Sequence, residues 1–294
     1  MRSRAEEEAR TAAEVREGLL SRPLPSLPSK LFYDERGGAL FDRITRLPEY
    51  YLTRTEEGLL PAVARDVVDR VRPRHLVELG SGLGAKVRTL LDAMAEADTG
   101  LCASGIVGDF LTDLGALGPG VSRLIAFLGS TIGNIHPREV PGFFRSAAAV
   151  LAPGDGLLVG LDLVKDRARL EAAYNDAQGV TAEFNRNILR VINTRLGADF
   201  EPDAFEHVAF YDAKAAWIEM RLRAPRGCRV RVAGAGVDLV LSPGGEIRTE
   251  ISCKYTRAAL EALLPATGLR LDSWQTDADA MFALALLRRA SKLR

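Results

Sequence analysis

Two motifs in the first half of the chain carry residue types that could bind a nucleotide-like ligand. Residues 77–82 read VELGSG, an apolar run and an acid followed by two glycines. Glycines at a strand-to-helix turn let a ligand approach the backbone, and the helix N-terminus favours negative groups. The third glycine of a dinucleotide turn is missing, since Lys86 and Val87 stand near its place. The acid before the glycines favours S-adenosylmethionine, and a plain tight turn is the alternative.

The second motif is Gly108-Asp109-Phe110, which follows a later expected strand. An acid can accept hydrogen bonds from the amine of an adenine, and an aromatic ring can lie against the face of the base. This pair favours the cofactor interpretation of the glycine turn over the structural one.

Two further stretches place polar groups where a small molecule could bind. Residues 127–134, FLGSTIGN, end an expected strand with two hydroxyls and an amide, at the edge where α/β sheets bind ligands. A structural loop is the competing interpretation. In residues 249–252, TEIS, Glu250 and Ser252 point to the same side of a strand. They could hold an imidazole or an ammonium, although a solvated strand face has the same pattern.

The elements that would position these motifs alternate between strand and helix. Alternation of this kind predicts an α/β fold with a doubly wound, Rossmann-like parallel sheet. We expect strands at 75–79, 105–108, 123–128 and 156–162, and helices at 56–71 (capped by Thr53 or Thr55), 86–97 and 138–151.

From about residue 165 the pattern changes. A helical stretch over 166–196 precedes several runs in which apolar and polar residues alternate, as in antiparallel strands with one wet face. The second half is therefore expected to be α+β. The alternating runs are 205–212, 215–224, 228–234 and 237–244, followed by 246–256, a helix over 257–264 and a final strand.

Composition excludes several classes of protein. Lys+Arg and Asp+Glu both number 39, which argues against a strongly basic nucleic-acid surface and gives no reason to expect membrane binding. The N-terminus is charged and has no apolar signal core, so we expect a cytoplasmic protein. The three cysteines and three histidines are scattered without a CxxC pair, so we expect no metal site.

Several segments together resemble the histidine Nα-methyltransferases of ergothioneine biosynthesis, which make hercynine (trimethylhistidine). The resemblance implies S-adenosylmethionine as methyl donor and L-histidine as substrate, and we expect a monomer. It also implies a methyltransferase domain over 55–164 and a second, substrate-binding domain built from 1–54 and 165–294. The segments, in order, are LFYDERGGALFDRITRLPEYYLTRTEEGLL, LVELGSG, GDF, FLGSTIGN, DLVKD, AYNDAQGVTAEFNRN and TEISCKY.

The resemblance assigns site residues where a motif is intact. Glu250 and Ser252 would read the imidazole, with Met220 near the same ring, and no residue is assigned as a catalytic acid or base. The implied cofactor residues are Tyr33, Gly80, Lys86, Asp109 and Phe110. The implied substrate residues are Tyr50, Gly129, Asn134, Tyr174, Met220, Glu250 and Ser252.

One segment departs from the family pattern. A methyltransferase sheet has a further strand and helix between the glycine-turn helix and the GDF strand, and that strand ends in the acid that holds the cofactor ribose. Here only residues 98–104, DTGLCAS, lie between them, whereas a βαβ unit takes roughly 30 residues. The chain therefore lacks about 25 residues, one strand–helix unit. A smaller departure is Leu52, where the family more often has proline.

Two alternatives stay open. The departure at 98–104 favours a catalytically impaired homologue, a pseudoenzyme or amino-acid-binding protein. The chain could also methylate another amino acid, such as tryptophan, although Glu250, Ser252 and Met220 favour histidine.

Overall fold

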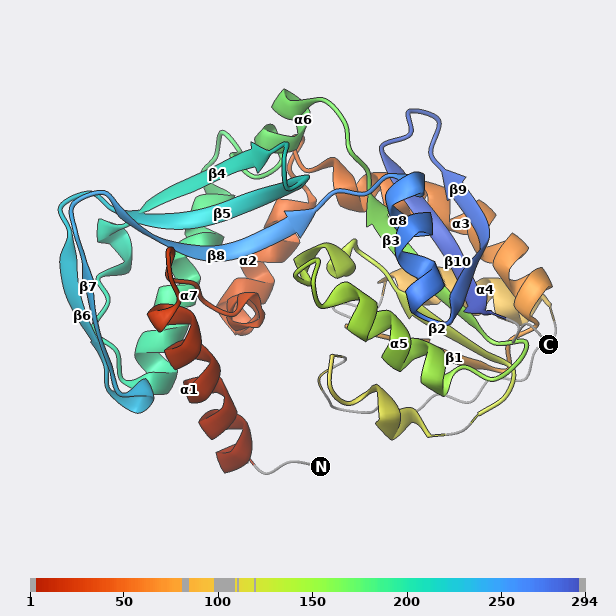
Figure 1. The fold of residues 1–294 in the computed structure, drawn as a ribbon. Helices are drawn as coiled ribbons and strands as arrows, with labels where there is room; N and C mark the ends of the chain where they lie inside the picture. Colours follow the sequence, from red (N-terminus) through yellow and green to blue (C-terminus); the bar gives the residue numbers. More distant parts are fainter. Residues whose placement is uncertain (1–3, 81–84, 98–108, 110, 119, 291–294) are drawn as a thin grey trace. The chain divides into compact units, whose positions relative to one another are not determined.

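The computed structural model of the chain describes residues 4–80, 85–97, 109, 111–118 and 120–290. The chain forms two compact units (Figure 1): unit 1 holds Met1–Tyr51 and Asp166–Ser252, and unit 2 holds Leu52–Lys165 and Cys253–Arg294. The segment from Cys253 onward lies in unit 2 and not, as expected, with the second domain. The reason is that its two strands complete the sheet of unit 2.

The sheet of unit 2 has five strands in the order β1-β2-β3-β10-β9. The first three pair in parallel, and β10 runs antiparallel to both of its neighbours. A predominantly parallel α/β sheet is confirmed. The strands are β1 (His75–Glu78), β2 (Arg123–Phe127), β3 (Gly156–Asp162), β9 (Leu269–Thr276) and β10 (Phe282–Arg289).

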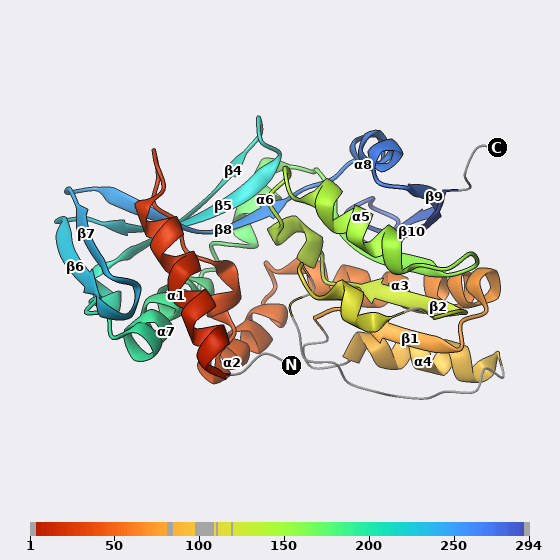
Figure 2. The same ribbon diagram turned by 60° about the horizontal axis from the view of Figure 1, so that its bottom comes forward.

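Helices cover both faces of this sheet. On one face, α3 (Tyr51–Val71) and α4 (Ala85–Glu96) join alternate residues of β2, β3 and β10 in one buried apolar cluster. On the other face, Phe143 of α5 (Val140–Val150) packs on Phe127, with ring centroids 4.9 Å apart. Figure 2 shows α5 and α4 on opposite sides of β1 and β2. Since both faces are covered, every residue of β2 and β3 is buried.

Unit 1 has a sheet in the order β4-β5-β8 and a separate hairpin of β6 and β7. Its helices are α1 (Arg4–Leu20), α2 (Glu35–Thr45), α6 (Arg167–Ala172) and α7 (Val180–Leu196). Its strands are β4 (Glu206–Asp212), β5 (Trp217–Ala224), β6 (Cys228–Val232), β7 (Val237–Leu241) and β8 (Gly245–Cys253).

Two helices differ from their expected bounds. Helix α3 begins at Tyr51, so neither Thr53 nor Thr55 caps it; the side chains of Tyr51 and Leu52 are buried, which favours the earlier start. The expected helical stretch over 166–196 is broken between α6 and α7. The expected strand at 105–108 and the segment 98–104 lie outside the described residues.

The carboxylate of Asp176 stabilises the N-terminus of helix α7. Asp176 Oδ2 accepts the N–H of Val180 (2.8 Å) and Oδ1 that of Thr181 (2.7 Å), and Gly179 between them has a φ of 69°. Burial raises the pKa of Asp176, but the hydrogen bonds from Thr181 and Val180 outweigh it and leave that pKa below its usual value. None of the described helices combines the length and apolar composition needed to cross a bilayer.

Candidate functional site

One glycine of each motif, Gly80 and Gly129, lies just beyond the carboxyl end of β1 or β2. The strands pair in parallel with Glu78 opposite Ala126, and the N–H of Leu79 donates to the Ala126 carbonyl (2.9 Å). Gly80 and Gly129 follow, with φ values of 69° and 74° that glycine adopts without strain. Both predicted residues therefore lie at the edge where α/β sheets bind ligands.

A buried carboxylate on α3 links two of the predicted site residues. Both oxygens of Glu56 accept the N–H of Gly129 (2.8 and 3.0 Å), and the same carboxylate forms an ion pair with Lys86. Glu56 is fully buried. A Cβ on Gly160 would lie 2.3 Å from Glu56 Oε1, so a side chain there would displace this carboxylate. Nothing in the residue pattern distinguishes Glu56 from the adjacent Glu57, so this role could not be predicted from the sequence.

The acid before the glycine turn, Glu78, is partly buried. Burial raises the pKa of Glu78, Lys86 opposes that shift and Glu56 adds to it. Within the described residues, Glu78 Oε2 is buried and has no hydrogen-bond partner, which is costly without a ligand. A ligand with an ammonium or hydroxyl group would supply that partner, as S-adenosylmethionine can. These residues fit the cofactor.

The hydroxyl groups of Ser130 and Thr131 fix the backbone of the FLGSTIGN segment through hydrogen bonds. Ser130 Oγ accepts the N–H of Asp162 (2.9 Å), and Thr131 Oγ1 donates to the Leu128 carbonyl (2.8 Å). Asn134 ends the short 3-10 helix η3 (Thr131–Asn134) and is partly exposed. The hydroxyls thus shape the loop that carries Gly129 and Asn134.

Of the GDF motif, the structure describes only Asp109. Asp109 Oδ1 accepts the N–H of Leu111 (3.0 Å), and the Asp109 N–H donates to Asp113 Oδ2 (2.9 Å), so the acid sits in a compact turn. Phe110, predicted to lie against the adenine, is outside the described residues.

In unit 1 the structure brings several predicted substrate residues together. The Tyr174 hydroxyl donates to Ser252 Oγ (2.8 Å), and the Tyr50 ring lies edge-on to Tyr174, with centroids 6.4 Å apart. All three side chains are buried. Glu250, two residues before Ser252 on β8, is partly exposed. Met220, on neighbouring β5, is almost completely buried.

Tyr33, predicted to contact the cofactor, belongs to unit 1. It follows the 3-10 helix η1 (Ser29–Phe32) and is 52% exposed. Its ring lies edge-on to Phe41 and Phe184, each at 5.7 Å. Its contact with the cofactor stays a prediction.

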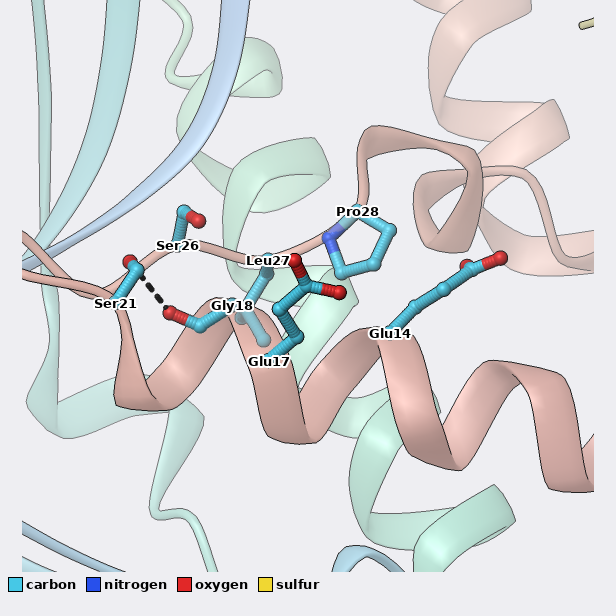
Figure 3. Close-up of a pocket in the computed structure, with 7 residues that line it drawn as sticks. All are labelled: Glu14, Glu17, Gly18, Ser21, Ser26, Leu27 and Pro28. Atoms are coloured by element: carbon cyan, nitrogen blue, oxygen red, sulfur yellow. Dashed lines mark hydrogen bonds between the residues drawn. The ribbon is translucent and has the colours of Figure 1, made fainter.

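A pocket of about 290 Å³ opens beside α1, and Figure 3 shows its lining. The Ser21 hydroxyl donates to the Gly18 carbonyl (2.8 Å) at one side. None of the predicted site residues lines it. The lining residues are Glu14, Glu17, Gly18, Ser21, Ser26, Leu27 and Pro28.

A sheet with three neighbouring parallel strands between two helical layers, with a glycine of positive φ after each of two adjacent strands, is the ligand-binding α/β architecture to which S-adenosylmethionine-dependent methyltransferases belong. The chain belongs to the family of histidine-specific, S-adenosylmethionine-dependent methyltransferases, whose model matches residues 11–101 and 97–289.

Relatives support this assignment along nearly the whole chain. The chain is 44% identical to the histidine N-alpha-methyltransferase of Mycolicibacterium smegmatis, over 94% of each chain. It is also 44% identical to the histidine N-alpha-methyltransferase of Mycobacterium tuberculosis, over 93% of each. The L-tryptophan methyltransferase trpM of Psilocybe serbica is 25% identical, over 94% of this chain and 92% of that protein.

The comparisons also bear on the length of the chain. The alignment with the M. smegmatis protein runs over 302 positions yet takes up 94% of a 294-residue chain. About two dozen positions of that relative therefore have no counterpart here. The two stretches matched by the family model meet at residues 97–101.

Proposed function

We propose that the chain transfers methyl groups from S-adenosylmethionine to the α-amine of L-histidine and forms hercynine, a step of ergothioneine biosynthesis. The observation that carries the proposal is the Tyr174–Ser252 hydrogen bond on the strand that also bears Glu250. An imidazole needs one acceptor and one donor. Glu250 supplies the acceptor, and Ser252, which accepts from Tyr174, supplies its own hydroxyl hydrogen as donor.

Methyl transfer requires the protein to align the substrate amine with the methyl group more than to act as an acid or base catalyst. The cofactor supplies an already activated methyl group on a sulfonium. The residues of this chain have to hold the histidine amine unprotonated and in line with it. The α-amine of a peptide titrates at about 7.7–8.0, that of a free amino acid is higher because of its own carboxylate, and a neighbouring positive charge lowers the pKa of an amine. Asn134 and Tyr174 would fix the substrate carboxylate and amine.

On the cofactor side, Gly80 and Gly129 give close access to the backbone, and Glu78 offers its buried oxygen. Lys86 is held by Glu56 at the same edge of the sheet. The roles of Tyr33, Asp109 and Phe110 are carried over from the family.

The proposal is tested by methyl transfer from labelled S-adenosylmethionine to a panel of amino acids, with the masses of the products recorded. We expect trimethylhistidine as the main product. Histidine that binds in calorimetric titration but gains no methyl group would contradict the enzymatic proposal and favour an amino-acid-binding homologue. The positions missing against the M. smegmatis relative are what supports that second candidate.

The substrate is tested by one substitution. Glu250→Ala should raise the KM for histidine by about tenfold or more, since a hydrogen bond to a charged group contributes about 1.5–3 kcal/mol. Affinity for S-adenosylhomocysteine should stay within about twofold. The opposite result, weaker cofactor-product binding with histidine selection intact, would show that Glu250 does not read the imidazole. A preference for tryptophan over histidine would favour the activity named for the Psilocybe relative. A cytoplasmic location and a monomeric state stay predictions.

A further inference from the structure

A completely buried amide on α7 has all its hydrogen-bonding groups engaged. Asn185 Oδ1 accepts the hydroxyl of Thr249 (2.6 Å), and Nδ2 donates to His207 Nδ1 (2.8 Å) and to the Arg221 carbonyl (2.9 Å). Asn185 has no exposed surface. Because a carbonyl accepts only, the Arg221 oxygen must face the amide nitrogen, so the orientation of the side chain is fixed.

This orientation fixes the protonation of His207. An imidazole nitrogen that receives an N–H must be unprotonated, so Nδ1 is the acceptor and Nε2 carries the hydrogen. Nε2 lies 2.8 Å from the Tyr174 carbonyl, which can only accept. Burial lowers the pKa of His207, with an opposing contribution from the bond to Tyr174. Neutral His207 therefore links Asn185 to the main chain of Tyr174.

The same chain of hydrogen bonds reaches the other predicted substrate residues. The hydroxyl of Thr249, which precedes Glu250 on β8, also lies 3.1 Å from the Met220 carbonyl. The Tyr174 hydroxyl reaches β8 again at Ser252. The Asn185 network thus joins α7 to β4, β5 and β8, and it holds the backbone on both sides of Glu250.

We propose that Asn185 and His207 are positioning residues for the amino-acid substrate: they touch no substrate themselves and set the places of Tyr174, Glu250 and Ser252. The inference rests on the proposed function, since it assumes that these three residues bind histidine. Neither residue carries a role from the family resemblance, although Asn185 lies in the AYNDAQGVTAEFNRN segment.

A matched pair of substitutions separates the two bonds of His207. In His207→Gln the amide nitrogen reaches the position of Nε2 and can still donate to the Tyr174 carbonyl. In His207→Asn the amide oxygen takes the position of Nδ1, and the bond to Tyr174 is lost. His75, exposed on β1, gives the control His75→Asn.

Calorimetric titration with histidine is the main measurement, in the full chain and with S-adenosylhomocysteine present. We expect His207→Asn and Asn185→Ala to raise the Kd for histidine about tenfold, since each leaves a buried polar group unsatisfied. His207→Gln should stay within about threefold, and His75→Asn should match the wild type. Affinity for S-adenosylhomocysteine alone should not change. Equal histidine affinity in His207→Asn and the wild type, with the fold intact, would overturn the proposal.

Nitrogen NMR of the ¹⁵N-histidine-labelled chain gives a readout that does not depend on activity. His207 should show a neutral ring protonated at Nε2 at neutral pH, and Asn185→Ala should alter the Nδ1 signal. A ring protonated at Nδ1 would contradict the network. A wild-type chain that binds histidine without methylating it would overturn the proposed function alone, and the affinities of the variants would still decide the positioning role. A wild type that does not bind histidine would overturn both.

Discussion

At the scale of single residues, the carboxylate of Glu56 contacts two predicted site residues, Gly129 and Lys86. It binds the N–H of Gly129 and pairs with Lys86 from a completely buried position. Removing one partner of a buried ion pair costs about 3–5 kcal/mol, because the other charge is left uncompensated. A change at Glu56 should therefore affect both the glycine-turn helix and the loop after β2.

We predict that Glu56→Gln lowers the affinity for S-adenosylhomocysteine by about tenfold or more, because Lys86 loses its counter-charge. The affinity is measured by calorimetric titration at a temperature where circular dichroism shows the variant to be folded. Glu57→Gln, at the exposed neighbouring position, is the control and should bind as the wild type does. Wild-type affinity in Glu56→Gln would show that Lys86 does not depend on this pair.

Residue types alone could not single out Glu56. The sequence TEEG offers two adjacent acids, and the choice between them is made by the start of α3 at Tyr51, which turns Glu56 inward. Motifs did point to Gly80 and Gly129, which follow two strands, and to Glu250 and Ser252, which alternate on β8, and their functional roles stay predictions. Asn185 and His207 gave no signal, since a buried polar network forms only once distant elements meet.

At the scale of elements, the break between α6 and α7 is enforced by Asp176, which caps α7 through two backbone N–H groups. The sequence predicted one helical stretch here, because periodicity does not register a carboxylate that accepts hydrogen bonds from residues after it. The positive φ of Gly179 completes the turn.

We predict that Asp176→Asn lowers the free energy of unfolding by about 1 kcal/mol, as measured by urea denaturation at pH 7, because the amide keeps one of the two acceptor oxygens and one hydrogen bond contributes about that much. The folded-state pKa of Asp176 lies below its ordinary value of 3.8. Its contribution is therefore fully present above that value and is lost as the pH falls through the lower, folded pKa. The difference between wild type and Asp176→Asn should shrink at such low pH, and a difference that grows on acidification would contradict the assignment.

At the scale of the whole molecule, each unit is assembled from two separate stretches of chain. The sequence predicted one final strand but neither β9 nor the sheet that both strands join, because an apolar run such as FALALLRR fits any buried position. In the structure β10 lies between β3 and β9, so it is an interior strand of unit 2. The α/β class followed from the alternation of strands and helices, whereas the partner of a late strand depends on tertiary contacts.

We predict that residues 52–165 alone do not form a stable unit, since β3, whose residues are all buried, would present an open edge in place of its pairing with β10. Size-exclusion chromatography should show aggregation, and thermal melting should lack a cooperative transition. Joining residues 253–294 to this fragment through a flexible linker should restore both. A monomeric, cooperatively melting 52–165 fragment would show that β10 is dispensable.

Because β10 lies near the end of the chain, unit 2 can be completed only late in translation. A ribosome delivers every residue of unit 1 before it delivers residues 253–294 of unit 2. Unit 1 can therefore fold before the chain is finished. Strands β1 to β3 are translated much earlier than β10, so the edge of β3 stays unpaired until β10 is made near the end. Nascent chains stalled before residue 282 should thus engage chaperones more strongly than chains released after β10 has emerged.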